Sequence, residues 1–258
     1  MREPIVNIAV SAARIAGNII LKALDRLDSL VVSEKKSNDF VTEIDQQVER
    51  EIIQVIRKSH PNHGILGEES GETPGNDFTW IIDPIDGTRN FVHGYPHFAI
   101  SIGIRFKNKI EHGVIYDPIR QELFSATRGK GARLNEHRIR VSKRIQLEQC
   151  LLGTTDYQST YYPHYAQAVS ELMATTELRY SGSAALDLAY VAAGRLDGFF
   201  GLNLKLWDLA AGVLFVKEAG GMTVDIEGGE SYLQTGDIIA GNPKVLKNLL
   251  KILRKPHS

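Results

Sequence analysis

The sequence contains one cysteine, Cys150, and has almost no excess of charge of either sign. A single thiol excludes an internal disulfide or a cysteine zinc cluster and is typical of a reducing compartment. Thirty Lys and Arg against 31 Asp and Glu give a net charge of −1, which argues against a strongly basic nucleic-acid binder. We also expect no signal peptide and no segment apolar enough to span a membrane. These absences predict a cytoplasmic globular protein without membrane contact.

Several common catalytic motifs are also absent from the 258 residues. There is no GxxxxGK[ST] phosphate loop, no GxGxxG dinucleotide fingerprint, no HExxH zinc motif and no GxSxG elbow. The histidines at 60, 63, 93 and 97 lack a shared helical spacing, because Pro96 interrupts the last pair. We therefore interpret them as surface or loop histidines.

Hydrophobic periodicity divides the chain into two regions. In the first, it predicts helices over 4–29 and from 41 to about 58, followed by closely spaced antiparallel strands at 79–83, 97–106, 109–116, 121–127 and 137–142. In the second, it predicts strands at 150–154 and 196–201, and helices at 161–175, 184–193, 208–219 and from Pro243 onward. This pattern favours an α+β layered sandwich of two sub-domains, residues 1–145 and 146–258.

Acidic residues gather in two short segments of the first region. Glu68 and Glu69 lie in a loop, and Asp83 and Asp86 follow the apolar residues 80–82. Unpaired carboxylates at the buried end of a strand are costly, so a positive partner such as Mg²⁺ is expected there. Asp and Gly are also ordinary turn formers, and a structural turn explains this segment equally well when it is taken alone.

A third acidic position, Asp208, lies within Trp207-Asp208-Leu209-Ala210-Ala211-Gly212. Its carboxylate can cap the helix that begins there. The small residues that follow it also allow another element to approach closely, which would direct the acid toward the space between the two halves. The sequence leaves both interpretations open.

Together these segments resemble the inositol monophosphatase family of Mg²⁺-dependent, lithium-sensitive phosphatases. The resemblance rests on Gly67 to Ser70, Asp83 to Thr88 and Trp207 to Gly212, in that order, and extends from about residue 5 to residue 250. Asn38 to Asp45 matches an upstream segment of the family, and Gly182 to Phe200 resembles a bacterial branch. The resemblance implies a layered αβαβα sandwich of the sugar phosphatase type, a homodimer, and two or three bound Mg²⁺ ions.

The resemblance also assigns roles to individual residues. The metal ligands would be Glu68, Asp83, the carbonyl of Ile85, Asp86 and Asp208. Thr88, paired with Asp45, would orient the attacking water, and Glu68 belongs to the same catalytic group. The backbone of Gly87 and Thr88 would bind the phosphate, and the alcohol side of the pocket would be lined by Gly182, Ser183 and Ala184.

Two departures from the family pattern concern the substrate. Gly201 stands where members that act on inositol have a glutamate, and Arg89 stands where many relatives have a second threonine. The leading prediction is hydrolysis of myo-inositol monophosphate or a similar small phosphate monoester. Alternatives with the same fold are fructose-1,6-bisphosphatase, nucleotide 3′-phosphatase and histidinol phosphatase, and losing a hydroxyl-binding carboxylate weakens discrimination among polyols.

A different class of function is also open, because the bacterial branch is associated with transcription antitermination. The chain could then bind a transcription complex, with incidental phosphatase activity. Lys244, Lys247, Lys251, Arg254 and Lys255 give the last 18 residues a charge of +5. They indicate either a terminal helix docked on the body or a contact with an anionic partner. Residues 33–40 are consistent with a mobile flap or an ordered hairpin.

Overall fold

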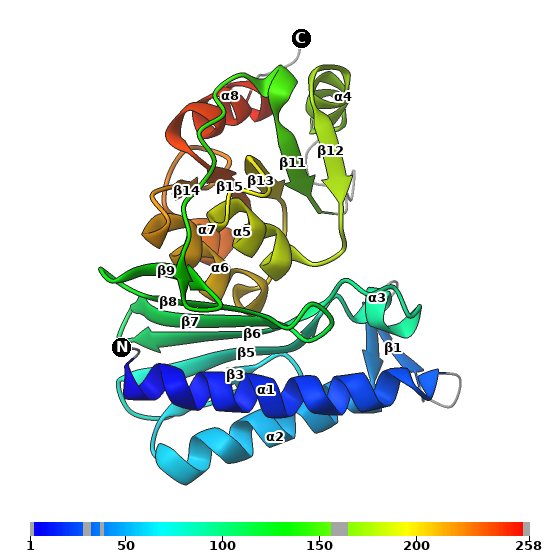
Figure 1. Cartoon of the computed structure of the whole chain (residues 1–258), viewed down its shortest axis with the longest axis vertical. Coiled ribbons are helices and arrows are strands. Elements are labelled where there is room, and N and C mark those ends of the chain that lie inside the picture. Colours follow the sequence, from blue (N-terminus) through cyan, green and yellow to red (C-terminus); the bar gives the residue numbers. More distant parts are fainter. Residues whose placement is uncertain (1–2, 28–31, 37–38, 156–164, 255–258) are drawn as a thin grey trace.

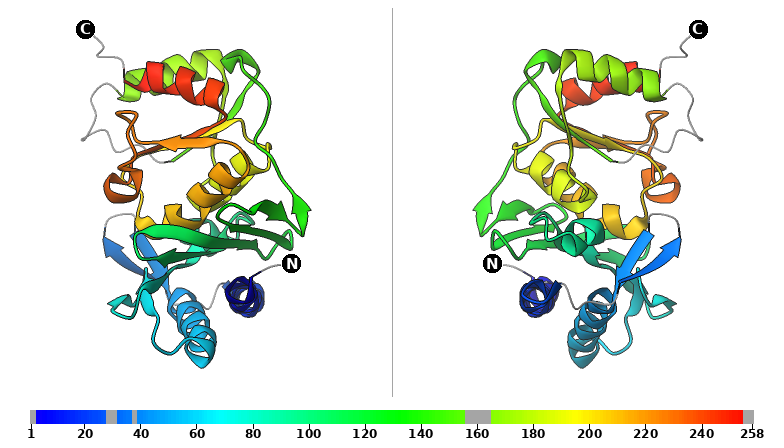
Figure 2. Two further views of the ribbon diagram at one scale, coloured as in Figure 1. Left: turned by 90° about the vertical axis from the view of Figure 1, so that its left-hand side faces the viewer. Right: turned by 90° about the vertical axis from the view of Figure 1, so that its right-hand side faces the viewer.

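The computed structural model describes residues 3–27, 32–36, 39–155 and 165–254. Five layers of alternating helices and sheets are stacked along the long axis (Figures 1 and 2). Helices α1 (Pro4–Leu24) and α2 (Glu43–Ser59) cover one face of an eight-stranded sheet, and helices α5 (Ala184–Ala192) and α6 (Leu206–Glu218) cover the other. A five-stranded sheet and then helices α4 (Tyr165–Thr175) and α8 (Pro243–Leu253) complete the stack. The expected αβαβα sandwich is confirmed.

The outer layer consists of α1 (Pro4–Leu24) and α2 (Glu43–Ser59). α1 ends five residues before the expected boundary, since Asp25 is already its C-terminal cap. α2 begins two residues later than expected, because Val41 and Thr42 pair with β1. The strands β1 (Val32–Lys36) and β2 (Asp39–Thr42) pair in antiparallel fashion, and residues 37–38 between them lie outside the described part, so the alternatives for residues 33–40 stay open.

Helix α1 is long and apolar enough, by length and composition, to cross a membrane, with a mean hydropathy of 1.5. The expectation that no segment reaches these limits is wrong for this helix. Its buried residues, among them Ala9, Ala13 and Ile20, belong to a core shared with α2 and the large sheet. In this fold α1 is therefore a core helix whose apolar face is covered by protein.

The large sheet has the strand order β10-β9-β8-β7-β6-β5-β3-β4. Its strands are β3 (Gly64–Gly67), β4 (Gly71–Thr73), β5 (Phe78–Asp86), β6 (Ala99–Phe106), β7 (Lys109–Asp117), β8 (Glu122–Thr127), β9 (Gly131–Leu134) and β10 (His137–Arg138). All neighbours from β5 to β10 are antiparallel, as expected, whereas β3 and β5 are parallel.

The strand expected at 137–142 is too long. It ends at Arg138, after only two residues. The reason is that the N–H of Val141 donates to the carbonyl of Ala219, at the end of α6, instead of to a neighbouring strand. The chain leaves the large sheet at this point and crosses toward the second sheet.

The second sheet has the order β12-β11-β13-β15-β14 and mixes parallel with antiparallel pairs. Its strands are β11 (Leu151–Thr154), β12 (Glu177–Tyr180), β13 (Gly198–Gly201), β14 (Met222–Val224) and β15 (Ile238–Gly241). The remaining helices are α3 (Thr88–Val92), α4 (Tyr165–Thr175), α5 (Ala184–Ala192), α6 (Leu206–Glu218), α7 (Tyr232–Thr235) and α8 (Pro243–Leu253), with a 3₁₀ turn at Leu147–Gln149. The part of the helix expected at 161–164 lies outside the described residues.

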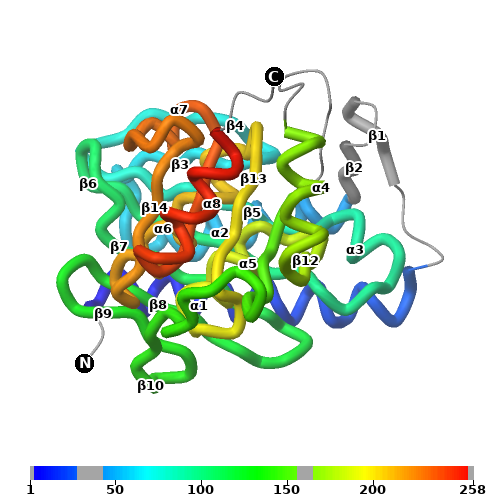
Figure 3. The backbone as a smooth tube through the Cα atoms, turned by 90° about the horizontal axis from the view of Figure 1, so that it is seen from above, coloured from blue at the N-terminus to red at the C-terminus, as the bar shows by residue number. Residues whose placement is uncertain are grey.

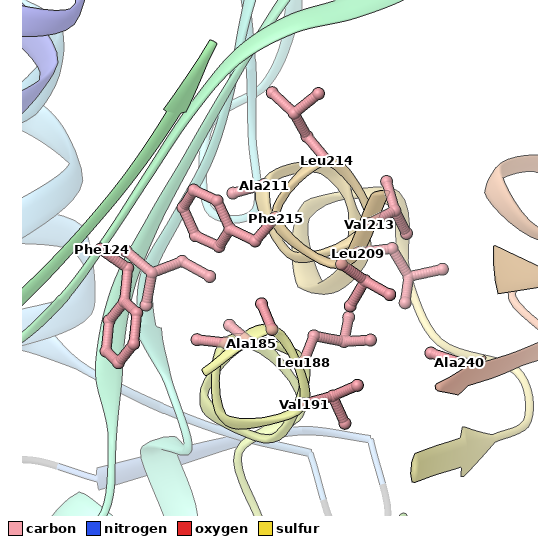
Figure 4. Packing of buried hydrophobic residues seen from close by; sticks show 14 of the residues in the cluster. Phe124, Ala185, Leu188, Val191, Leu209, Ala211, Val213, Leu214, Phe215 and Ala240 are labelled. Atoms are coloured by element: carbon pink, nitrogen blue, oxygen red, sulfur yellow. The ribbon is translucent and has the colours of Figure 1, made fainter. Parts of the chain in front are cut away.

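The central helices pack closely on the large sheet because small residues meet there. A Cβ on Gly103 of β6 would lie 2.7 Å from the Cβ of Ala210, and one on Gly113 of β7 would lie 3.1 Å from the Cα of Ala211. Gly212 faces Leu188 of α5 with similar closeness. Figure 4 shows α5 and α6 side by side in this core. Both helices contact β6 and β7, and in the view from above in Figure 3 they overlap strands of the large sheet. The small residues after Asp208 thus fix the start of α6 against β6.

Candidate active site

Three aspartates from distant parts of the chain form a carboxylate cluster, which we define as Asp83, Asp86 and Asp208. One oxygen from each lies within 4.8 Å of the others. Asp83 and Asp86 end strand β5, and Asp208 lies in the first turn of α6. Residues three apart in a regular strand point to opposite faces. Here the ladder between Asp83 and Asp86 holds one extra residue, opposite Ser101 to Ala99 of β6, and this bulge accounts for their convergence.

Glu68 reaches the same place through the parallel pairing of β3 with β5. Gly67, the last residue of β3, is the register partner of Ile82. The next residue, Glu68, donates its N–H to the carbonyl of Ile82 at 3.1 Å, and its charge lies close enough to Asp83 to raise the pKa of that carboxyl. The carboxyl ends of the two strands therefore bring the expected ligand Glu68 beside the carboxylate cluster.

The three carboxylates of the cluster repel one another when ionised, and a bound cation would offset this repulsion. Burial, and then the charges of Glu68, Asp86 and Asp208, raise the pKa of Asp83 well above its usual range. Burial raises the pKa of Asp86 to about 6, and burial together with the charge of Asp86 raises that of Asp208 to about 7. Asp83 Oδ1 is buried without a hydrogen-bond partner among the described residues. Carboxylate oxygens arranged in this way fit a divalent cation such as Mg²⁺.

We expect the metal-free protein to lose stability as the pH rises. A carboxyl whose folded pKa is raised favours the folded state at low pH and opposes it once ionised, so the loss should run from about pH 4 through the folded values of about 6 and 7. In EDTA, the melting temperature should fall by about 5 °C or more across this window. Adding Mg²⁺ at pH 8 should restore it, and a melting temperature that is independent of pH in EDTA would contradict the prediction.

Asp208 performs both roles that the sequence left open. One carboxylate oxygen accepts a hydrogen bond from the backbone N–H of Lys205 at 2.8 Å, which caps the start of α6. The carboxylate also belongs to the cluster with Asp83 and Asp86. The cap fixes the carboxylate's orientation, and this favours a preorganised ligand position.

Thr88 and Asp45 are brought together although they lie 43 residues apart. The Thr88 hydroxyl is 3.0 Å from Asp45 Oδ1 and also 3.0 Å from the carbonyl oxygen of Ile85. Asp45 is on the buried face of α2, and Thr88 begins α3. Gly87 between the strand and the helix has φ 104°, and a Cβ there would lie 3.1 Å from the carbonyl of His97, so glycine is required at this turn.

The expected substrate residues 182–184 lie at the start of α5. Ser183 is buried, and its hydroxyl donates to Asp86 Oδ2 at 2.5 Å, while the N–H of Ala185 donates to the same oxygen at 2.7 Å. Gly182 has φ +82° and lies against Asn90. The start of α5 therefore holds Asp86 at the end of β5, and Ser183 contacts a cluster carboxylate instead of an open pocket.

Two positioning residues are missing from the sequence-based predictions. Asn90 donates from Nδ2 to the carbonyls of His97 and Ser181, at 2.7 and 2.8 Å, and so joins the turn after β5 to the start of α5. Glu49 contacts the loop that carries Glu68. The sequence does contain a sign of this role of Glu49. It lies four residues, about one helical turn, after Asp45, so both side chains share the buried face of α2.

None of the histidines at 60, 63, 93 and 97 belongs to the carboxylate cluster. His63 lies in the loop before β3, as expected, but it is buried, stacked on His60 at 4.3 Å, and accepts a hydrogen bond from Trp80 Nε1 at 2.9 Å. The interpretation of His63 as a surface or loop histidine is therefore correct for its position in the chain but not for its exposure. Burial lowers its pKa, and because the indole N–H of Trp80 can only donate, the His63 Nδ1 that accepts its bond carries no proton.

Known proteins resemble this chain over nearly its full length. The profile of the inositol monophosphatase family matches residues 1–257. Nus factor SuhB of Escherichia coli (strain K12) is 50% identical over 260 residues, which cover 98% of this chain and 96% of that protein. The crystal structure of extragenic suppressor protein suhB from Bartonella henselae has a TM-score of 0.96 and 43% identity, covering 99% of this chain and 100% of that one.

A solved structure named for the enzyme activity is also similar. The Thermotoga maritima IMPase has a TM-score of 0.89 and 37% identity, and the match covers 97% of each chain. The family profile, the sequence identities and the shared layered fold all agree. This chain belongs to the inositol monophosphatase family and has the fold of that family.

Proposed function

We propose that this protein is a Mg²⁺-dependent phosphatase of small phosphate monoesters, with myo-inositol monophosphate as the first candidate substrate. The observation that carries the proposal is the carboxylate cluster, with oxygens within 4.8 Å, next to the Thr88–Asp45 pair at 3.0 Å. Membership of the inositol monophosphatase family supports the reaction class.

The metal would be held by oxygen donors from three segments: the loop after β3, the end of β5 and the start of α6. Glu68, Asp83 and the carbonyl of Ile85 would serve one Mg²⁺, and Asp83, Asp86 and Asp208 a second, with two or three ions in all. When bound, Mg²⁺ supplies Lewis acidity and positive charge toward the phosphate oxygens. The unpartnered Asp83 Oδ1 supports this assignment, since a buried carboxylate oxygen without a partner is costly.

The Thr88–Asp45 pair would position the attacking water. A hydroxyl that donates to Asp45 Oδ1 keeps lone pairs free to accept a hydrogen bond from water. The water's oxygen would then be turned toward phosphorus, and its proton could pass through the Thr88 hydroxyl to Asp45. Asp45 is only 1% exposed, so bulk water does not compete for this path. Glu68 would complete the catalytic group from the metal side.

The phosphate would be bound by the backbone N–H groups of Gly87 and Thr88, where α3 begins. Gly87, with φ 104°, turns the backbone sharply between the last cluster residue of β5 and the helix. The alcohol part of the substrate would lie toward Gly182 and Ala184. In this assignment Ser183 acts by fixing Asp86.

Substrate choice rests on the region around Gly201. A Cβ at this position would lie 2.8 Å from Thr155 Oγ1 and 2.9 Å from Leu204 Cδ1, so other side chains occupy the space next to it. Position 201 thus provides no hydroxyl-binding carboxylate, and the neighbouring side chains leave no ready space for one there. We infer a broad preference among polyol phosphates, because such a pocket discriminates less between hydroxyl patterns.

Phosphate release with Mg²⁺ tests the proposed function. Inositol 1-phosphate, fructose 1,6-bisphosphate, adenosine 3′,5′-bisphosphate and histidinol phosphate would be assayed in parallel. We expect hydrolysis of inositol 1-phosphate at rates within about tenfold of the best substrate, the discrimination that one or two pocket contacts provide. A strong preference for the nucleotide or for histidinol phosphate would reassign the enzyme, and no release from any of the four would reject the proposal.

Two further family properties belong to this proposal. Inhibition by Li⁺ is proposed because Glu68 and the complete carboxylate cluster are present, and it is measured in the same assay. A homodimer is proposed by family resemblance and is measured by sedimentation. Insensitivity to tens of millimolar Li⁺ would show a different second metal site, and a monomeric mass would refute the dimer.

We propose a second role, binding to a transcription complex, on a separate observation. The relatives at about 50% identity are named Nus factor SuhB. Helix α8 docks on the body through its apolar face, while Lys244, Lys247, Lys251 and Arg254 line its exposed side. Capture of transcription proteins by an Asp83→Asn variant would support a role independent of hydrolysis. Absence of any partner in that experiment would count against it.

A further inference from the structure

Glu49 lies on the buried face of α2, one helical turn after Asp45. Its side chain is buried, with a relative exposure of 1%. A glutamate is almost never buried to this extent unless its carboxylate is compensated. The role of this carboxylate is therefore to be found in its partners.

Both carboxylate oxygens of Glu49 bind the backbone of the loop that follows Glu68. Oε2 accepts from the N–H of Glu69 at 2.9 Å, and Oε1 accepts from the N–H of Ser70 at 2.7 Å. The Glu49 carboxylate also packs closely against Gly67, the residue before Glu68. A Cβ on Gly67 would lie only 2.5 Å from this carboxylate. The residues before and after Glu68 are thus both held against Glu49.

The Glu49 carboxylate is compensated by backbone hydrogen bonds and not by a cationic side chain of the described residues. Within the described part of the chain, no Lys, Arg or His forms an ion pair with it, and its two hydrogen bonds come from neutral N–H groups. Removing a carboxylate from water without a cation is unfavourable. A cation held by the neighbouring Glu68 would offset part of this cost, so the bound metal and the Glu49 contact would stabilise each other.

We propose that Glu49 is a positioning residue for metal binding, which fixes the turn from Gly67 to Ser70 so that Glu68 faces the carboxylate cluster. This inference rests on the proposed metal-dependent function and extends it to a residue outside the ligand set. Residues that orient a metal ligand typically change metal affinity by about 10- to 100-fold when they are replaced. Helix α2 then supplies two buried carboxylates to the site, Asp45 for Thr88 and Glu49 for the Glu68 loop.

Glu49→Gln tests this role, because it keeps the size of the side chain but places an NH₂ group against a backbone N–H. Mg²⁺ binding is measured by calorimetry, and phosphate release is measured against Mg²⁺ concentration. We expect the Mg²⁺ dissociation constant to rise about tenfold or more. The kcat at saturating Mg²⁺ should return close to the wild-type value, because excess metal repopulates the site. Glu51→Gln, on the same helix, is the matched control and should leave both curves unchanged.

Two more variants keep the test decisive if Glu49→Gln folds poorly. Gly67→Ala leaves Glu49 intact but pushes its carboxylate away, and it should weaken Mg²⁺ binding in the same direction. Glu49→Asp keeps the charge with a shorter reach and should give an intermediate dissociation constant. A wild-type Mg²⁺ affinity in Glu49→Gln and Gly67→Ala, with only a lower melting temperature, would overturn the proposal.

The binding measurement separates this inference from the proposed function. If the wild-type protein binds Mg²⁺ but hydrolyses no phosphate ester, the proposed function fails, and a weaker affinity in Glu49→Gln still supports the positioning role. If the wild-type protein hydrolyses the ester and Glu49→Gln binds Mg²⁺ equally well, the positioning role fails alone.

Discussion

Asp83→Asn is expected to lower Mg²⁺-dependent phosphate release by on the order of 1,000-fold or more. Asp83 is the carboxylate on which the charges of Glu68, Asp86 and Asp208 all act, so it occupies the centre of the ligand set. An amide of the same size cannot provide its negative charge to a cation. The assay is phosphate release from inositol 1-phosphate with saturating Mg²⁺, and activity within tenfold of wild type would contradict the assignment of the site.

The same substitution should stabilise the metal-free protein at neutral pH. Burial and three neighbouring carboxylates raise the pKa of Asp83, so ionising it opposes folding when no cation is present. In EDTA at pH 8, Asp83→Asn should therefore melt several degrees above the wild type, by about 5 °C. Asp77→Asn, an exposed aspartate just before the start of β5, is the control and should change neither quantity. A less stable Asp83→Asn protein would show that the carboxylates do not repel one another as inferred.

Thr88→Ala is expected to lower kcat by about 100- to 10,000-fold, the range typical of a lost general acid–base group. The substitution removes the hydroxyl that lies 3.0 Å from Asp45 Oδ1 but leaves the carboxylate cluster intact. Mg²⁺ affinity measured by calorimetry should therefore stay close to wild type. This separation of kcat from metal binding distinguishes Thr88 from Asp83 and from Glu49.

Two companion variants test the pair itself. Thr88→Ser keeps the hydroxyl and should retain most of the activity. Asp45→Asn should show a loss similar to that of Thr88→Ala, and combining the two should cost little more than either alone, since both disable one proton path. Full additivity of the two losses would mean that Thr88 and Asp45 act independently.

Much of the fold could be predicted from local patterns. The helical repeat of apolar residues identified α1, α2 and α8, and alternation identified β6, β7 and β8, because each element buries one face. The short strands β3, β4, β9, β12, β14 and β15 were missed, since three or four residues carry too little periodicity. The prediction of a long strand at 137–142 was wrong because the N–H of Val141 donates to the carbonyl of Ala219, which is far away in the sequence.

The sequence by itself determined which chemical groups are present: the acidic segments around Glu68, Asp83 and Asp208, in the order typical of the family. Only the tertiary structure decided how they meet. The bulge in β5 turns Asp83 and Asp86 toward one another, and the parallel pairing of β3 with β5 brings Glu68 beside them. The contacts of Ser183 with Asp86 and of Glu49 with the Glu68 loop join residues 97 and about 20 positions apart. Local propensity depends on near neighbours, whereas these contacts depend on how whole layers pack, and so they become visible only in the folded chain.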